Sequence, residues 1–229
     1  MKRSQTTDVL AVVVAIAAGL TAASVEATVT ADTIRRSLAL NMKLITQYEW
    51  KQQITVVRKG TPAEPILERV QIDDAGQMQR TVLSGPDQTK LHGLRAKIAA
   101  EVRADVKGMM ELVSRYNRPQ KLMEAIGKAT VGPAAGGAVL LQVKDIVQAG
   151  DAMAMTFDAS TQRAIHIEIK TDYDGAPMTV MQDYGPVVNG PNVMRSMTAS
   201  APRKSLVVKV QSTDFEKAPG ISAVAASLK

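Results

Sequence analysis

One long helix-patterned segment, residues 90–131, separates two runs of strand-patterned sequence. Its apolar residues recur at steps of three or four, as they do on one face of an amphipathic helix. They are Leu91, Leu94, Ile98, Val102, Val106, Met109 and Val113. A helix from Leu91 to about Tyr116 spans roughly 40 Å at 1.5 Å per residue, and a strand of about eleven residues is similarly long. The stripe therefore predicts a helix that lies across a sheet built from the flanking strands.

The sequence before this segment predicts one short helix and three strands. Asp32 or Thr33 can cap a helix that runs through Ile34 and Leu38 toward Leu44. From Gln47 to Val56 the apolar period changes to two, which indicates a strand with one wet face. Strands at 64–73 and 77–84 follow, joined by a short turn whose Gly76 supplies the positive φ angle.

The sequence after it predicts a second helix, an extended loop and six strands. The helix covers Gln120–Lys128, and the loop covers the Gly- and Pro-rich residues 131–137. The strands are 138–148, 151–158, 162–171, 176–188, 192–199 and 205–214. Connections this short join antiparallel neighbours. We expect an α+β fold: a strongly curved antiparallel β-sheet, an unclosed β-barrel of about nine or more strands, covered by the helical insert 90–131.

The first 27 residues have the pattern of a secretory signal peptide. Lys2 and Arg3 precede an almost wholly apolar run from Val9 to Ala23, and small residues follow. We predict cleavage after Ala27 and a periplasmic location. A retained membrane anchor is the alternative, although the run is shorter than the roughly 20 residues that span a bilayer. The rest is expected to form a single domain, 28–217, and a flexible tail, 218–229.

Charge and composition exclude several classes of function. The net charge is +6 with or without residues 1–27, so the basic excess belongs to the mature chain. No cysteine is present, which excludes disulfides, thiol catalysis and a lipidated cysteine. Aromatic residues make up only 3% of the chain, which argues against the stacking platforms of single-stranded nucleic-acid binders. The basic surface either faces anionic lipid or serves solubility alone.

The chain contains no motif that predicts catalysis, a metal or a cofactor. His166 lies between two isoleucines, which places it on a solvated strand face, and His92 has no second ligand nearby. Asp172 and Asp174 suggest a hairpin turn more than a calcium loop, because the closing glutamate is missing. A hydrolase with an unrecognised site is the remaining enzymatic alternative.

Two other features bear on a hydrophobic site. Arg95 and Asp105 fall within the helical stripe, where they either reach out to water or serve a polar head group; we favour the first. Methionines gather in the predicted strands, where thioethers either adapt to varied apolar shapes or simply fill the core. These are Met78, Met153, Met155, Met178, Met181, Met194 and Met197.

The order of these elements resembles the LolA-like outer-membrane lipoprotein-sorting family of periplasmic lipoprotein carriers. The resemblance covers residues 30–217. It rests on the strand Gln47-Tyr48-Glu49-Trp50-Lys51, the helical insert, Phe157-Asp158 before a turn, and the final strand from Val208 to Phe215. It implies an unclosed barrel with helices in its mouth and acyl chains held in the apolar space between. The ligand-binding residues that follow are Trp50, Ile54, Met155, Phe157, Ile167, Val180, Val208, Leu94 and Ile98.

The resulting functional hypothesis is a periplasmic, non-enzymatic carrier or binding protein. Its ligand would be a lipid, a lipoprotein acyl chain or another hydrophobic molecule. An anionic membrane surface and an envelope protein are further candidate partners, and nucleic acid is not expected. The alternative is a protein-interaction or sensor module of the cell envelope that uses the sheet surface and binds no small ligand.

Overall fold

The computed structural model describes residues 29–73, 77–87 and 92–218. The predicted signal peptide and cleavage site lie outside the described residues, as does the predicted tail beyond Ala218. Within those three ranges, no helix is both long enough and apolar enough to cross a membrane.

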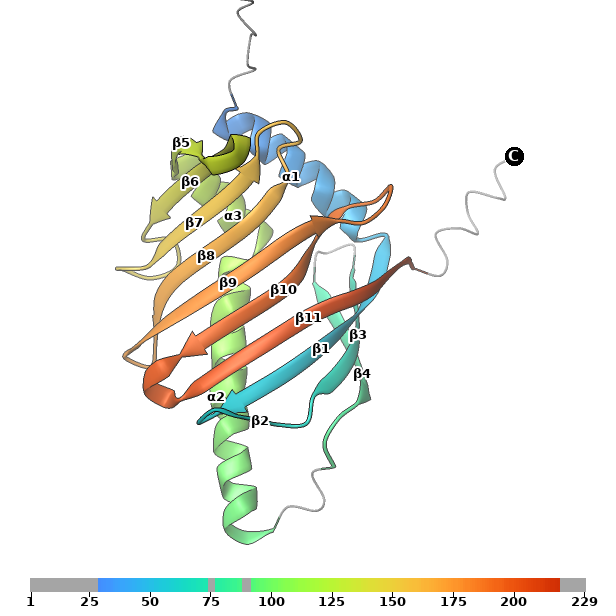
Figure 1. Cartoon of the computed structure of the whole chain (residues 1–229), viewed down its shortest axis with the longest axis vertical. Coiled ribbons are helices and arrows are strands. Elements are labelled where there is room, and N and C mark those ends of the chain that lie inside the picture. The colour runs from blue at the N-terminus through green and yellow to red at the C-terminus, as the bar shows by residue number, and fades with distance from the viewer. Residues whose placement is uncertain (1–28, 74–76, 88–91, 219–229) are drawn as a thin grey trace, which may run out of the picture.

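Eleven strands form one open antiparallel sheet (Figure 1). The strands are β1 (Tyr48–Arg58), β2 (Thr61–Pro62), β3 (Ile66–Ile72), β4 (Met78–Ser84), β5 (Thr130–Ala134), β6 (Ala138–Lys144), β7 (Ala152–Asp158), β8 (Ala164–Tyr173), β9 (Ala176–Pro186), β10 (Asn192–Ala201) and β11 (Leu206–Lys217). Their order is β4-β3-β1-β11-β10-β9-β8-β7-β6-β5, with β2 paired to β1. The sheet ends at β4 and β5 without closing. The predicted α+β fold, an unclosed antiparallel sheet with a helical insert, is confirmed.

Three helices lie on one face of this sheet, behind it in Figure 1. They are α1 (Ala31–Ile45), α2 (Gly93–Tyr116) and α3 (Pro119–Lys128). The predicted cap of α1 was wrong by two or three residues. Thr30 is the N-cap, because its hydroxyl accepts the backbone N–H of Thr33 while the Thr33 hydroxyl accepts that of Thr30. We call the helix-covered face concave and the opposite face convex.

The core lies between the concave face and the helices. Along each strand, alternate side chains point to this face, and they pack against Ile34 of α1, Ile126 of α3 and the C-terminal half of α2. Five methionines are almost completely buried there: Met109, Met153, Met155, Met178 and Met197. Methionine thus accounts for much of the core.

Two of the predicted elements differ most from the structure. Residues 130–134 form β5, whereas the Gly- and Pro-rich sequence predicted a loop; Pro133 is tolerated because β5 is an edge strand. β6 ends at Lys144 instead of 148. The side chain of Asp151 accepts the backbone N–H groups of Ile146, Val147 and Gln148, so these groups leave the strand ladder.

Two polar clusters fasten α2 to the sheet. Near its C-terminus, the Tyr116 hydroxyl donates to Asp151 Oδ2 at 2.7 Å and lies 2.7 Å from Thr171 Oγ1. Further toward the N-terminus, Asp105 accepts the Lys204 ammonium at 2.7 Å. The prediction that Asp105 simply reaches out to water was therefore wrong: it is half-buried and paired. The Arg95 side chain lies outside the described part of the chain.

The N-terminal half of α2 extends past the end of the sheet (Figure 1). Leu94 is 73% exposed and Ile98 is 41% exposed, whereas Met109 and Val113 on the same stripe are buried. The sheet thus covers only the second half of the apolar stripe.

Candidate functional site

Six of the nine predicted ligand-binding residues come together in the core on the concave face. They are Ile54, Met155, Phe157, Ile167, Val180 and Val208. Strand register places five of them, all but Phe157, in two rows that run across the sheet. One row is Val208, Ala199, Val180, Ile169 and Met153. The other is Ile54, Val210, Met197, Gln182, Ile167 and Met155.

The other three predicted residues lie apart from this cluster. Trp50 is buried, but its ring stacks on Phe215 at a centroid distance of 5.8 Å, and the Arg195 guanidinium lies over Phe215 at 4.7 Å. Leu94 and Ile98 are exposed on the overhang of α2. Whether any of the nine residues contacts a ligand stays a prediction, because side chains of the helices occupy the space over the concave face.

One buried amide interrupts the second row. Gln182 is 0% exposed, between Met197 and Ile167 on the neighbouring strands. Its Oε1 accepts the Tyr184 hydroxyl at 3.1 Å, but its Nε2 has no hydrogen-bond partner in the described part of the chain. Sequence reasoning missed it, although its signal was present: Gln182 shares the inward parity of Met178 and Val180 on β9.

A small cavity of about 30 Å³ lies between α1 and the sheet, and Tyr184, the hydrogen-bond partner of Gln182, lines it. Leu38 and Asn41 of α1 line it from one side, and Phe157 and Tyr184 of the sheet line it from the other. Burial raises the pKa of the Tyr184 phenol, so the hydroxyl is neutral at any physiological pH. The hydroxyl group that donates to Gln182 is therefore uncharged.

Asn41 fastens α1 over the cavity. Its Nδ2 donates to the backbone carbonyl of Asn192 at 2.8 Å, and its Oδ1 accepts the backbone N–H of the same residue at 2.6 Å. Of the fifteen described residues of α1, only Ile34 is fully buried. The helix thus covers the cavity with little apolar anchoring.

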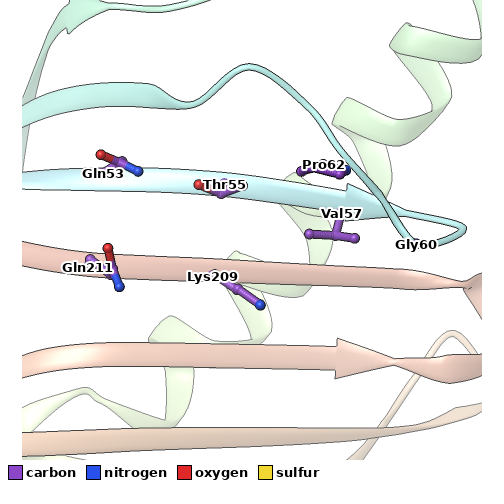
Figure 2. A pocket seen from close by; sticks show the side chains of 7 residues that line it. All are labelled: Gln53, Thr55, Val57, Gly60, Pro62, Lys209 and Gln211. Atoms are coloured by element: carbon purple, nitrogen blue, oxygen red, sulfur yellow. The ribbon is translucent and has the colours of Figure 1, made fainter.

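A second hollow lies on the convex face (Figure 2). It is an open groove of about 350 Å³ between the exposed faces of β1 and β11 and the hairpin at Gly60 and Pro62. Gln53 and Gln211 lie side by side on its floor, next to Thr55 and Lys209, as Figure 2 shows. Its lining combines polar side chains with the apolar Val57 and Pro62, and it includes none of the predicted ligand-binding residues.

The convex face also carries a Ser-Asp-His cluster. His166 Nδ1 lies 2.7 Å from Asp183 Oδ1, and the Ser196 hydroxyl donates to Asp183 Oδ2 at 2.8 Å. These hydrogen bonds, that of His166 first, lower the pKa of Asp183. The carboxylate lies between the other two groups, whereas activation of a serine requires the imidazole in the middle. The cluster is therefore not a catalytic triad, and its geometry ties β8, β9 and β10 together.

Comparisons with known proteins gave matches among solved structures alone. No family model matches the chain, and no curated protein matches it. Among solved structures, a DUF1329 family protein from Desulfovibrio piger aligns at TM-score 0.41 and 8% identity, over 88% of this chain and 100% of that one. A putative outer membrane lipoprotein-sorting protein domain from Vibrio parahaemolyticus aligns at 0.43 and 9%, over 84% and 95%. A LolA superfamily protein from Nitrosomonas europaea aligns at 0.39 and 10%, over 86% and 97%. The likeness is to LolA-like folds.

Proposed function

We propose that this protein is a non-enzymatic carrier or binding protein for a hydrophobic ligand, held between the concave face and the helices. One observation carries the proposal: the apolar face of the sheet is closed by separate helices, not by further strands. A core closed by strands could open only if the hydrogen bonds between strands broke, whereas this core opens when a helix moves away from the sheet.

The composition of the core supports the same function. Met153 and Met155 project from β7, Met178 from β9 and Met197 from β10, and all four are almost fully buried. An unbranched thioether side chain changes shape at small cost. A core rich in such residues can repack around an acyl chain more easily than one built from β-branched side chains.

The direct test is native mass spectrometry of the protein purified from its own cells, followed by organic extraction. We expect an apolar adduct, and the extract gives its class. In parallel, the purified protein should take up diphenylhexatriene, a fluorescent hydrocarbon. A bare polypeptide mass together with no uptake of the probe would contradict the proposal.

A pair of variants distinguishes the two faces of the sheet. Met155→Lys places a charge in the core, and we expect it to abolish probe uptake. Met181→Lys makes the same change at an exposed position of β9 and should leave uptake intact. Circular dichroism identifies the folded variants. A folded Met155→Lys protein with normal uptake would show that the ligand does not bind at the concave face.

The convex groove favours a second function, an interaction module of the cell envelope. Its exposed lining of mixed polar and apolar side chains suits a protein partner more than a lipid. This function predicts no bound ligand, and it predicts that Gln53→Ala and Gln211→Ala weaken capture of a partner without changing the stability of the fold. Loss of probe uptake in the same variants would argue against it.

We place the protein in the periplasm because of its N-terminal sequence. The test is N-terminal sequencing of the protein recovered from a periplasmic fraction. We expect the mature chain to begin at Thr28, after the predicted cleavage at Ala27. A chain that begins at Met1 in the membrane fraction would support the retained anchor.

A further inference from the structure

The buried amide of Gln182 is the one polar side chain in its row of the concave face. It lies in the row Ile54, Val210, Met197, Gln182, Ile167 and Met155. A buried N–H group without a partner costs free energy comparable to a lost hydrogen bond. An alkyl side chain at this position would avoid that cost. A polar group kept here is thus explained if it has a partner in another state of the protein.

We infer that Gln182 Nε2 is the donor that selects a carbonyl-bearing ligand, a fatty-acyl ester or amide, over a plain hydrocarbon. The inference rests on the proposed function and names the ligand class for the same site. The Nε2 group offers N–H donors and no charge, which suits the carbonyl oxygen of an ester or an amide. Tyr184 fixes the orientation of the side chain by donating to Oε1, and so leaves Nε2 for the ligand.

The residues around Gln182 indicate where the carbonyl group and the alkyl chain of the ligand would lie. Tyr184, which donates to the Gln182 amide, also lines the small cavity under α1, together with Phe157 and Ala164. At about 30 Å³ this cavity has room for water only, not for the head of an acyl chain. A chain therefore enters only when α1 moves, and the apolar neighbours of Gln182 in its row, Met197 and Ile167, then contact the alkyl part.

Competition against diphenylhexatriene tests this with three molecules of matched length: methyl palmitate, N-methylpalmitamide and heptadecane, delivered from cyclodextrin. For the wild-type protein we expect the better carbonyl competitor to displace the probe at about one-tenth of the heptadecane concentration, which is roughly the effect of one hydrogen bond to a buried donor. The ester and the amide share the carbonyl group and differ only in the atom attached to it, an oxygen or an N–H, so their ranking indicates the preferred linkage.

Two variants assign the effect to Gln182. Gln182→Met keeps the length of the side chain and removes the donor, and it should bring all three competitors to the heptadecane value without weakening the probe. Gln52→Met is the matched control, because Gln52 is equally buried on β1 but its Nε2 already donates to Ser212 Oγ at 3.4 Å. It should keep the tenfold preference.

The outcomes separate this inference from the proposed function. Equal displacement by all three competitors in the wild type overturns the inference and assigns the amide to bound solvent, while the carrier function stands. No probe binding at all overturns both. If Gln182→Met does not fold, the inference is tested by NMR on the wild-type protein. Methyl palmitate should shift the side-chain amide resonance of Gln182, and heptadecane should not. A resonance unchanged by the ester overturns the inference.

Discussion

Asp151 organises more of the structure than any other single side chain around α2. It is 1% exposed and accepts four hydrogen bonds, three from backbone N–H groups of residues 146–148 and one from Tyr116. Burial alone would raise the pKa of its carboxyl group, but these hydrogen bonds outweigh burial and lower the pKa. The carboxylate therefore links the loop after β6 to the end of α2.

We expect Asp151→Asn to lower the free energy of unfolding at pH 7 by about 2 kcal/mol, because charge-assisted hydrogen bonds are lost. The folded-state pKa of Asp151 lies below the unfolded value of about 3.9. Its stabilisation is thus complete above that pH and is lost as the pH falls through the folded-state pKa. Urea titrations from pH 7 to pH 3 should show the variant and wild type converging in acid. The exposed Asp172→Asn serves as the control, and parallel curves for Asp151→Asn would contradict the assignment.

Gly108 of α2 faces the ring of Tyr173. A Cβ at this position would overlap the tyrosine hydroxyl and lie 3.0 Å from its Cε2. Alanine normally stabilises a helix interior relative to glycine by up to about 1 kcal/mol. Here we expect Gly108→Ala to lower the melting temperature, since overpacking costs about 1–3 kcal/mol.

Gly127 of α3 provides the matched comparison for that substitution. Its Cβ would meet only the end of the Arg35 side chain, at 3.9 Å. Gly127→Ala should therefore raise the melting temperature. Changes of the same sign in the two variants, measured by differential scanning calorimetry, would show that Tyr173 does not restrict α2.

At the scale of elements, α2 has two halves with different surroundings. Its second half packs in the core. Asp105 lies at the boundary between the halves and accepts a hydrogen bond from the ammonium of Lys204, which also donates to Asp174 in the β8–β9 turn at 2.8 Å. These hydrogen bonds raise the pKa of Lys204, which keeps the ammonium charged. The ammonium also lies 5.0 Å from the centre of the Tyr173 ring. Lys204 thus joins α2 to two connections of the sheet, the β8–β9 turn and the β10–β11 connection in which Lys204 itself lies.

Hydrogen exchange should reveal these halves. We expect fast exchange of backbone amides in residues 93–104 and slow exchange in residues 105–116, because local opening depends on buried contacts. Lys204→Met should move the boundary toward the C-terminus of α2. Lys107→Met removes an exposed lysine whose pairing with Glu111 is long, at 3.8 Å, and should leave the boundary where it is. A boundary unaffected by Lys204→Met would show that apolar packing alone holds the helix.

Local sequence patterns predicted most elements because alternation and helical periodicity are properties of neighbouring residues. β5 was missed because Gly132 and Pro133 give this edge strand the composition of a loop. The periodicity also predicted which face of α2 is apolar, but not how much of that face the sheet covers. Leu94 satisfies the stripe as well as Val113 does, yet the sheet ends before reaching it. Trp50 was predicted to line the ligand site with the six core residues, but it lies apart from them because its ring stacks on Phe215, which is distant in sequence.

At the scale of the whole molecule, the proposed function predicts that α1 leaves the sheet when a ligand enters. The chain has no cysteine, so a pair can be introduced without competing thiols. The side chain of Asn41 lies on the backbone of Asn192, which brings the two residues close enough for a cross-link. In Asn41→Cys/Asn192→Cys, we expect oxidation to block uptake of diphenylhexatriene and reduction to restore it. The reduced form is the folding control, and uptake by the oxidised form would place the entrance elsewhere.

The pairing of β1 with β11 has a consequence for biogenesis. Gln52 and Ser212, neighbours in these strands, are 160 residues apart in sequence, and β1 reaches the main body of the sheet only through β11. Native pairings of such high contact order form slowly, because the intervening chain must first be closed into a loop. While the chain is still being synthesised, β1 has no β11 to pair with. The topology thus delays completion of the sheet until β11 has left the ribosome.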